Sequence, residues 1–568
     1  MLTAPSLATG FALDDYLFAV VIRKLPMVVP QTGPLDLFRF GDGKARTVRG
    51  LMDLGQIVWT SDPSTRGAFL RPISALTHIL DFTAWPFSPA LMHAHSLLWF
   101  AACLGMTGLL YRRLLATPWI AGLATLLYAV DDVHGEVVAW IANRNALIAY
   151  ALAAPVLWLH DRQRRDGLSS AAWLGPTFLI AALLAGESAV GIVAYLAAYA
   201  LHIDEGPWRQ RIASLAPHAL ILAAWRVAYV HFGFGVSGSS IYIDPGRSPE
   251  AFLVALPRRL AFLLLGQFAF PRADVGELYE YLSPHADIWA FAFAIAVIMT
   301  LGAAIAGLWR RDRITRFFVT GILIACIPIS ATAPGDRLLL FVSFGAAGLI
   351  AQLVDFAATR FERSAASFLL VLHVAIATPL LAVKSSSVPF GEPNMVTDRD
   401  IPRSPDIQTK TVVLVNPPGE LFGMVLIASR IARGLPHPEH LYSLAPVTAA
   451  LEVSREDANT LQIRPPDGFL AHTLERGWRS PEHPLLAGSV VELARMTVSV
   501  PESTPDLRPA DARFHFDVPL EDQSLLWLRW DHQHFVPWTP PPIGQTIHLP
   551  AYGFREFLHD LTSKLSPH

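Results

Sequence analysis

The chain has 568 residues, of which 52% are hydrophobic and 16% are charged, and its formal net charge at pH 7 is −3. Soluble globular domains carry about 25% charged residues, and here the shortfall comes from long apolar segments. The nearly neutral balance gives no support for nucleic-acid binding. Cys103 and Cys326 both lie in apolar stretches, which argues against a disulfide framework.

The first segment, residues 1–88, is predicted to lie outside the membrane. It lacks the basic stretch and apolar stretch of a cleavable signal peptide. Asp14, Asp15 and Tyr16 precede the apolar run of residues 16–22. Adjacent carboxylates can act as a general base or hold a divalent cation. An aspartate before an apolar run is also typical of a helix N-cap, and spacing alone favours the cap.

Most of the chain from residue 89 to 384 is predicted to form a multi-helix membrane domain, because a membrane span needs roughly 20 mostly apolar residues. Single spans are predicted at residues 89–111, 114–130, 141–159, 214–232, 286–309, 317–333, 338–357 and 365–384.

Two further stretches of this domain need separate interpretations. Residues 171–203 are apolar apart from Glu187 and are predicted to form a helical hairpin that turns at Gly186 and Glu187. Residues 251–270 contain Pro257, Arg258 and Arg259 and are predicted to be an interfacial or re-entrant helix. The fold class is thus an all-α membrane domain of about ten or eleven transmembrane helices.

The orientation follows from arginines in short loops, which remain cytoplasmic. Such arginines are Arg112, Arg113, Arg162, Arg164, Arg165, Arg209, Arg211, Arg310, Arg311, Arg313, Arg316, Arg360 and Arg363. The opposite, extracytoplasmic face then receives residues 1–88, the loops near 131–140, 186–187, 233–285 and 334–337, and the tail. In a bacterium this places the protein in the inner membrane with a periplasmic C-terminal domain.

The tail loses the long apolar runs of the membrane domain. Residues 385–405 are predicted to be a linker, and residues 406–568 a small α+β domain. Within that domain we expect a strand at 411–415, a helix at 420–433, and strands at 490–500, 512–518 and 524–530. His532 and His534 would share one face of a strand, as a metal-ligand pair or as part of an amphipathic surface.

Charged residues gather in the predicted extracytoplasmic loops. Asp131, Asp132, His134 and Glu136 follow a span directly, and they either face a cavity or form an ordinary interfacial loop. Glu187 needs a partner because an unpaired charge at membrane depth costs roughly 3 kcal/mol or more.

Arginines on the same face offer partners for Glu187 and for phosphate. Arg71 and Arg144 are the predicted partners of Glu187. Arg71, Arg144, Arg258 and Arg337 carry the forked guanidinium group that suits phosphate, although each could instead reach lipid headgroups. Residues 242–245 follow a Gly/Ser-rich loop that would act as a lid or as a plain connector.

Taken in order, these segments resemble the GT-C superfamily of membrane glycosyltransferases, especially the PMT-like enzymes and the bacterial relatives of the transmembrane-and-TPR O-mannosyltransferases. The resemblance covers residues 10–350 and is carried by GFALDDY at 10–16, FLRPISALTHILD at 69–81, LMHAHSLLW at 91–99, DDVHGEVVAWIANR at 131–144, GES at 186–188 and DRLLLFVSFG at 336–345.

The sequence departs from the family pattern at three points. Asp131, Asp132 and His134 replace a His-Pro step, and Gly186 replaces a lysine before Glu187. The tail shows no TPR repeats. The family's first span, which precedes the acidic loop, is missing, and we expect it to lie upstream of Met1.

The resemblance implies a hexosyl or mannosyl transferase that uses a polyprenyl-phosphate sugar donor and an extracytoplasmic acceptor (protein, lipid or polysaccharide). Asp14 or Asp15 would be the general base. The residues implied to bind the substrate or the donor phosphate are Arg71, His134, Glu136, Arg144, Glu187, Arg258 and Arg337. Some members of the family also hold a divalent cation, Mg²⁺ or Mn²⁺, at their acidic loops. Membrane lipids are the other expected partners, and nucleic acid is not one.

Two other functions fit the same sequence. One is a transporter or flippase for a lipid-linked sugar, which would require charged residues at the membrane midplane. The other is a catalytically degenerate GT-C scaffold that anchors its periplasmic domain, which the altered His-Pro and Lys-Glu steps favour.

Overall fold

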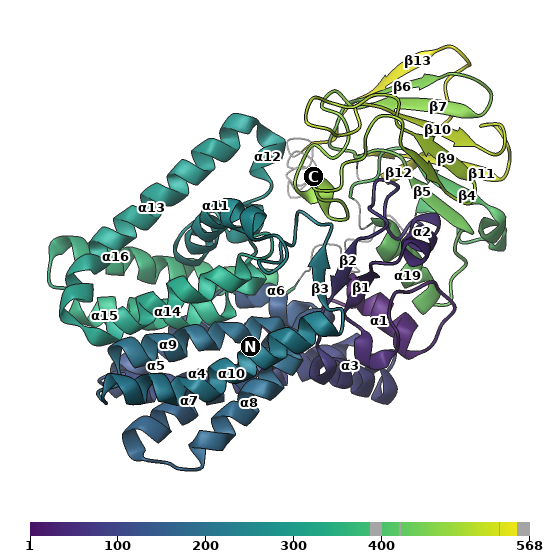
Figure 1. Cartoon of the computed structure of the whole chain (residues 1–568). Coiled ribbons are helices and arrows are strands. Elements are labelled where there is room, and N and C mark those ends of the chain that lie inside the picture. The colour runs from purple at the N-terminus through teal and green to yellow at the C-terminus, as the bar shows by residue number, and fades with distance from the viewer. Residues whose placement is uncertain (387–399, 420–421, 533, 554–568) are drawn as a thin grey trace.

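The computed structural model describes residues 1–386, 400–419, 422–532 and 534–553. Figure 1 shows a helical half that contains the long apolar helices and a sheet-rich half at the C-terminus, with the N-terminal segment between them. This arrangement confirms the predicted fold class, a helical membrane domain followed by a small α+β domain.

Every predicted single span coincides with a helix, but the helices differ in length. In the described part of the chain, five helices are long and apolar enough to cross a membrane by length and composition: α4 (Pro89–Leu114), α10 (Trp208–His231), α11 (Pro249–Phe268), α13 (Pro284–Arg311) and the continuous helix Arg360–Lys384. The last contains α16 (Arg360–Leu370), the π-helical turn η7 (Val371–Ile376) and α17 (Ala377–Lys384).

The remaining predicted spans form the interior of the bundle. They are α5 (Pro118–Val130), α7 (Arg144–Asp166), α8 (Ala171–Ala185), α9 (Gly191–His202), α14 (Arg313–Ile329) and α15 (Leu340–Phe356). In α15 the fourteen residues from Leu340 to Leu353 are all buried. A helix that is apolar all round is typical of a bundle core.

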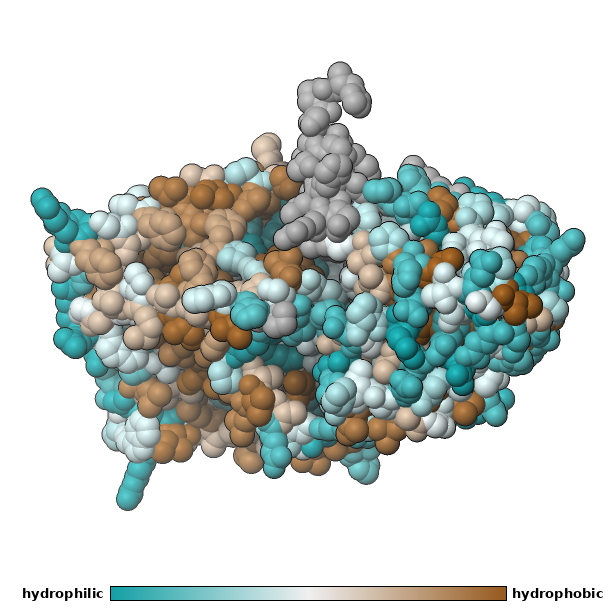
Figure 2. All heavy atoms as spheres, turned by 90° about the horizontal axis from the view of Figure 1, so that it is seen from above, coloured by the Kyte–Doolittle hydropathy of each residue, from teal (hydrophilic) through white to brown (hydrophobic). Residues whose placement is uncertain are grey.

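The outer helices expose large apolar side chains to their surroundings. Leu98, Val254, Trp289 and Met299 are all more than two-thirds exposed. Figure 2 shows apolar side chains gathered over the helical half and hydrophilic ones over the sheet half. Apolar surface of this extent is stable against lipid and not against water. The protein is a multi-pass membrane protein.

The predictions for residues 171–203 and 251–270 have different outcomes. The break at Gly186 and Glu187 is confirmed, since α8 ends at Ala185 and a short 3-10 helix, η4 (Glu187–Val190), leads into α9. The two helices then separate, with α8 packing mainly on α7 and α9 on α14. Residues 251–270 form the unbroken helix α11, which continues through Pro257, so the re-entrant alternative is wrong.

The N-terminal segment contains η1 (Ala4–Ala8), α1 (Asp14–Ile22), η2 (Pro34–Asp36), β1 (Arg39–Asp42), α2 (Ala45–Asp53), β2 (Arg66–Ala68) and α3 (Pro72–Ala84). Strand β3 (Gly235–Ser237), from the loop after α10, pairs antiparallel with β2 and completes a three-stranded sheet in the order β1-β2-β3. This sheet lies between the helical half and the C-terminal domain (Figure 1).

The C-terminal domain has two sheets. Strands β4 (Thr411–Leu414), β5 (His440–Ser443), β11 (Leu525–Asp531) and β12 (His534–Pro537) form a four-stranded sheet in which β11, β4 and β5 are parallel. The second sheet has the order β13-β6-β7-β10-β9-β8. Its strands are β6 (Leu451–Arg455), β7 (Thr460–Arg464), β8 (Val490–Glu492), β9 (Met496–Ser499), β10 (Ala512–Phe516) and β13 (Thr546–Leu549).

Most predicted elements of this domain match the structure, but residues 490–500 form two antiparallel strands, β8 and β9, where one strand was predicted. Helix α19 (Phe422–Ala432) lies where a helix was expected, and Gly434 follows it at φ +67° as a helix terminator. His532 and His534 do not share a strand face, because β11 ends at Asp531 and β12 begins at His534, so they flank the turn.

The predicted boundary between residues 1–88 and the tail does not separate two packing units. Trp59 is buried in the core of the C-terminal domain, where its Nε1 donates to Leu444 O at 2.9 Å and its ring meets Phe469 and Phe514 edge-on. Arg479 donates to Thr60 O at 2.5 Å. An indole contributes a large buried area, so residues near 59 are part of that domain's core.

The predicted linker, residues 385–405, falls mainly outside the described residues, which resume at Asp400. Its described end is not a free connector. Ile401 is fully buried, and Arg430 donates to Ile401 O at 2.7 Å and to Pro402 O at 2.9 Å.

Candidate active site

The acidic pair opens helix α1, and its two carboxylates have different surroundings. Asp15 is fully buried, and its oxygens accept hydrogen bonds from Ala12 N at 2.8 Å and Ala142 N at 2.7 Å. Asp14 is half-buried and has no hydrogen bond or ion pair with any residue that the structure describes. The predicted aspartate N-cap is wrong, because the N-cap residue is Leu13 and Asp14 is already helical.

The different environments also separate the two acids chemically. Burial raises the pKa of Asp14 to about 6, although the positive charges of Arg337 and Arg71 partly oppose this shift. Burial raises the pKa of Asp15 to about 8 despite its two backbone hydrogen bonds. At neutral pH Asp14 is therefore the carboxylate that is both ionised and open, whereas Asp15 joins α1 to the loop before α7.

Arg337 faces Asp14 from the short helix η6 (Asp336–Leu338). Its Nη1 lies 3.5 Å from Glu136 Oε1, and its guanidinium carbon lies 5.3 Å from the centre of the Trp140 ring. Glu136 and Trp140 belong to α6 (His134–Ala139) and its C-cap. About one-third of the Arg337 side chain, 34%, stays exposed, so its fork retains open donors.

Arg71 also interacts electrostatically with Asp14 and is the partner of Glu187. Its Nε donates to Glu187 Oε2 at 2.7 Å, and Tyr229 Oη donates to Glu187 Oε1 at 3.1 Å. The Arg71 guanidinium also lies over the rings of Phe69 and Phe38, at 4.6 and 5.0 Å. Of the two partners predicted for Glu187, the structure selects Arg71. One edge of the guanidinium group remains available to a ligand.

Arg144, the other predicted partner, lies elsewhere and is closed. It is fully buried in an ion pair with Asp81, and it donates to Ser96 Oγ at 2.9 Å and to Met92 O at 2.7 Å. His95 Nδ1 lies 2.7 Å from Asp81 Oδ1 in the same group. The predicted contact of Arg144 with a donor phosphate is therefore wrong for this conformation, since every side of its guanidinium group is occupied.

Arg258 is also committed to protein carboxylates. Its guanidinium group meets Asp287 at 2.6 Å, Glu277 at 2.8 Å and Glu280 at 3.8 Å. These contacts join α11 to the start of α13, and among the described residues no hydrogen bond or ion pair connects Arg258 to Asp14 or Arg337. The position of Arg258 fits a structural ion-pair network better than the predicted phosphate site.

His134 is buried among aromatic rings and does not face the site. Its ring lies 4.5 Å from the Tyr128 ring and 5.3 Å from the Phe100 ring, centre to centre. Both ring nitrogens lack hydrogen-bond partners among the described residues. Burial lowers the pKa of His134 to about 4, so the imidazole is neutral and is poorly suited to bind a phosphate.

A network of ion pairs around Lys384 lies beside Glu136 and Arg337. Lys384, at the end of α17, pairs with Asp336 and lies 3.3 Å from Asp132 and 3.8 Å from Asp274. Arg272 completes the network by pairing with Asp132. The carboxylate of Asp132 is therefore paired with cations, which favours an internal charge network over an ordinary interfacial loop.

Sequence reasoning missed Lys384, Arg272, Asp274 and Asp336. Lys384 ends the last apolar stretch, where a lysine is ordinarily assigned to the lipid headgroups. The only local signal was the run of polar residues at 334–337 and 271–274, each between two apolar stretches.

The loop after α10 covers one side of the site and is fixed at both ends. Tyr242 packs against Phe69 with ring centres 5.7 Å apart and interacts electrostatically with Arg337. Ile243 N donates to Ala331 O at 2.7 Å, and Arg259 donates to Ser240 O at 2.8 Å. These bonds favour a built-in wall over the predicted alternatives of a free lid or a plain connector.

The sequence left open whether a divalent cation binds at the acidic loops. Across the described ranges, no three His, Cys, Asp or Glu side chains are grouped closely enough to hold a metal ion. The Asp132, Asp274 and Asp336 carboxylates converge on the Lys384 ammonium group instead.

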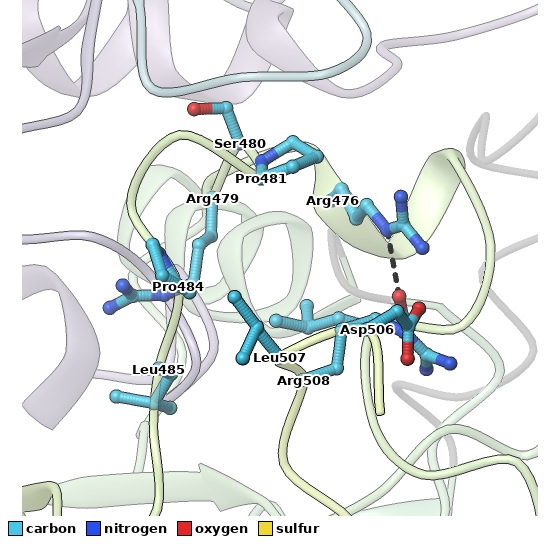
Figure 3. Close-up of a pocket in the computed structure, with 10 residues that line it drawn as sticks. Arg476, Arg479, Ser480, Pro481, Pro484, Leu485, Asp506, Leu507 and Arg508 are labelled. Atoms are coloured by element: carbon cyan, nitrogen blue, oxygen red, sulfur yellow. Dashed lines mark hydrogen bonds and ion pairs between the residues drawn. The ribbon is translucent and has the colours of Figure 1, made fainter. Parts of the chain in front are cut away.

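A separate cavity lies in the C-terminal domain, bordered by Arg476, Ser480, Leu485, Asp506 and Arg508 (Figure 3). Its volume is about 50 Å³, which suits one or two water molecules and not a sugar. Arg476 donates to Leu470 O at 2.7 Å and Arg508 to Asp506 at 2.6 Å, so the nearby cations are already paired. This cavity is not the candidate active site.

No protein-family model matches the chain, and no curated protein sequence matches it. Solved structures give a partial likeness. ArnT from Cupriavidus metallidurans in the apo state is 11% identical, with 77% of this chain and 87% of that chain covered and a TM-score of 0.35. The same protein bound to undecaprenyl phosphate is 11% identical, with 73% and 82% covered and a TM-score of 0.33.

The oligosaccharyltransferase of Archaeoglobus fulgidus is 12% identical, with 76% of this chain and 64% of that chain covered and a TM-score of 0.37. The folds overlap only in part at these scores, so chemistry at the site has to be inferred from its own residues.

Proposed function

We propose that this protein is a membrane glycosyltransferase that moves a hexose from a polyprenyl-phosphate carrier to a hydroxyl group on an extracytoplasmic acceptor. The observation that carries the proposal is the half-buried carboxylate of Asp14, which has no hydrogen bond or ion pair among the described residues and interacts electrostatically with the guanidinium groups of Arg337 and Arg71. A base and preplaced cations are what glycosyl transfer from a phosphate leaving group requires. Undecaprenyl phosphate, the ligand in one of the ArnT structures, belongs to this class of carrier.

In the proposed reaction Asp14 accepts the proton of the acceptor hydroxyl group. The acceptor oxygen attacks the anomeric carbon and forms the new glycosidic bond. The bond between that carbon and the carrier's phosphate oxygen breaks, and the electron pair leaves with the phosphate. Arg337 then balances the added negative charge, and Arg71, held by Glu187, supports it.

Other residues near the site would act through Asp14, Arg337 and Arg71. Glu136 and Trp140 hold the Arg337 guanidinium group in position. Lys384 neutralises the carboxylates of Asp132 and Asp336, so that the donor phosphate does not meet uncompensated negative charge. We further propose that this site and the C-terminal domain lie on the periplasmic side of a bacterial inner membrane, because short arginine-rich loops are typical of the cytoplasmic side.

A direct transfer assay tests the proposal. Membranes that contain the protein receive radiolabelled polyprenyl-phosphate hexose, and label is followed into lipid, protein and polysaccharide fractions. We expect transfer by the wild-type protein and none by Asp14→Asn at equal protein level. Movement of the labelled lipid across the bilayer without transfer would support the flippase instead, and absence of both would support the scaffold. A parallel reaction with EDTA tests the need for a divalent cation.

A further inference from the structure

Arg66, at the start of β2, is a cation without a partner. Its side chain has no hydrogen bond or ion pair in the described part of the chain, and its Nε is shielded from solvent. A guanidinium group has five N–H donors, and a donor that is shielded from water and has no acceptor destabilises the folded protein. A ligand with several acceptor oxygens would remove this cost.

Two more guanidinium groups gather with Arg66 around residues 233–235. A Cβ placed on Gly233 would lie 3.8 Å from Arg66 Nη1, and the Arg39 guanidinium carbon lies 5.1 Å from the centre of the Phe234 ring. Burial and the positive charges of Arg247 and Arg39 lower the pKa of Arg66, although the Asp42 carboxylate opposes this shift. Glycines allow the close approach. A Cβ placed on Gly43 would lie 3.3 Å from Arg66 Nε, and one on Gly235 would lie 3.9 Å from Arg247 Nε.

The carboxylates nearby are committed to other groups. Asp36 binds Arg39 at 2.6 Å, and Asp244 binds Arg226 at 2.6 Å while it stays 3.9 Å from Arg247. Asp42 accepts from Thr47 Oγ1 at 2.9 Å and from Lys44 N at 3.0 Å. The carboxylate that interacts with Arg66, Asp42 on the paired strand β1, is therefore already hydrogen-bonded to other groups, and Arg66 makes no hydrogen bond or ion pair with it.

The cluster is connected to the candidate active site through aromatic rings. Arg39 lies 5.1 Å from the centre of the Phe234 ring, and Phe234 packs on Tyr229 with ring centres 5.7 Å apart. Tyr229 donates to Glu187, which holds Arg71. Arg66 and Arg71 are five residues apart on nearly extended chain, which spans at most about 17 Å. One or two sugar rings would bridge such a distance.

We propose that Arg39, Arg66 and Arg247 form a subsite for a phosphate group on the acceptor, placed so that a hydroxyl group of the same molecule reaches Asp14. The forked guanidinium groups can each offer two donors to phosphate oxygens. This assignment rests on the proposed glycosyl transfer for its role, but phosphate binding at the subsite can be measured without any transfer. The assignment of this subsite narrows the class of acceptor to compounds that carry a phosphate group.

The test uses the purified full chain in detergent and measures its unfolding temperature in inorganic phosphate against chloride at equal ionic strength. Ligand binding to the folded state raises that temperature in proportion to occupancy. We expect phosphate to stabilise the wild type. We expect Arg66→Gln and Arg247→Gln to need at least tenfold more phosphate for the same rise. Arg46→Gln, on the exposed face of α2, is the matched control and keeps the wild-type response.

Two further variants separate this subsite from the donor site. Arg337→Gln and Asp14→Asn are expected to retain the response to phosphate, even where they abolish sugar transfer. A response lost in Arg337→Gln but kept in Arg66→Gln would overturn the proposal, as would the absence of any response in the wild type. Without phosphate, Arg66→Gln is expected to unfold no earlier than the wild type because repulsion is relieved. An earlier unfolding with an unchanged response to phosphate would mean a purely structural role and would also overturn it.

The source of the phosphate is tested in vesicles. The protein is reconstituted in phosphatidylcholine, with or without phosphatidic acid, and the response to inorganic phosphate is measured again. We expect the same response in both. In the opposite outcome, the wild type loses the response to phosphate when phosphatidic acid is present, and Arg66→Gln in the same vesicles shows no response at any phosphate concentration. That outcome would assign the subsite to a bilayer headgroup and overturn the acceptor assignment.

Discussion

Two arginines on the same face of the membrane domain, Arg144 and Arg337, differ in how completely their charges are paired. Arg144 is fully buried, and its partners Asp81, Ser96 and Met92 use its donors. Arg337 touches Glu136 at 3.5 Å, retains 34% of its side-chain exposure and faces the unpaired Asp14. Both lie in segments that resemble the same family, yet only the second has donors left for a ligand.

The difference shows why residue type and motif position do not suffice to assign a role. A closed ion pair stabilises the fold or costs free energy when it is broken, whereas an open one can do chemistry. The same distinction divides Asp15, held by two backbone amides, from Asp14. The following experiments test whether the open groups carry activity and the closed ones carry stability.

The largest effect is expected for Asp14→Asn. It removes the proposed base without leaving a broken ion pair, so transfer should fall by roughly 10²–10⁴-fold at normal protein level. The measurement is transfer of labelled sugar in membranes. Asp15→Asn provides the contrast, because the amide cannot accept from both Ala12 and Ala142. It should lower the unfolding temperature first, and full activity of Asp14→Asn would exclude Asp14 as the base.

Arg144→Met should mainly affect stability. It would leave the Asp81 carboxylate buried without its cation, at a cost of about 3–5 kcal/mol. Thermal unfolding in detergent measures the loss, and the double variant Arg144→Met, Asp81→Leu should recover part of it because both charges are then absent. A stable but inactive Arg144→Met protein would instead place Arg144 among the functional residues.

Arg337→Gln should mainly affect transfer. Loss of one preplaced donor to a developing charge costs about 10²–10³-fold in rate. The unfolding temperature should change little, since the guanidinium group is only loosely paired with Glu136. Arg337→Gln and Arg144→Met are measured side by side to compare an open arginine with a closed one. Equal losses of stability in the two variants would contradict this distinction.

The smallest effect is expected from pH. Asp14 must be ionised to act as a base, so transfer should rise about tenfold per pH unit up to its pKa of about 6 and then level off. The titration of Asp15 affects stability, and its contribution falls as the pH rises. Its pKa is raised to about 8 in the folded protein, so the stability it confers is fully present below pH 3.8 and is lost as pH rises to 8. Rate and unfolding temperature should therefore move in opposite directions between pH 5 and 6. A rate that does not change over this range would contradict the assignment of Asp14.

Much of the fold could be predicted from the sequence. The apolar stretches predicted every single-span helix, and the shift in composition after Lys384 predicted the α+β domain. Predictions failed where a boundary depended on distant contacts. Trp59 belongs to the core of a domain that starts more than 300 residues later, and no local pattern marks it for that core.

The sequence by itself determined that the chain spans a membrane in several helices and that its charged residues collect in the loops between apolar stretches, because hydrophobic length and charge are local properties. Only the tertiary structure decided which charges are paired. Asp14, Arg71, Glu136, Arg337 and Lys384 come from five separate segments, and the packing of those segments sets each distance and each degree of burial. Pairing is a property of neighbours in space, which the order of residues along the chain does not contain.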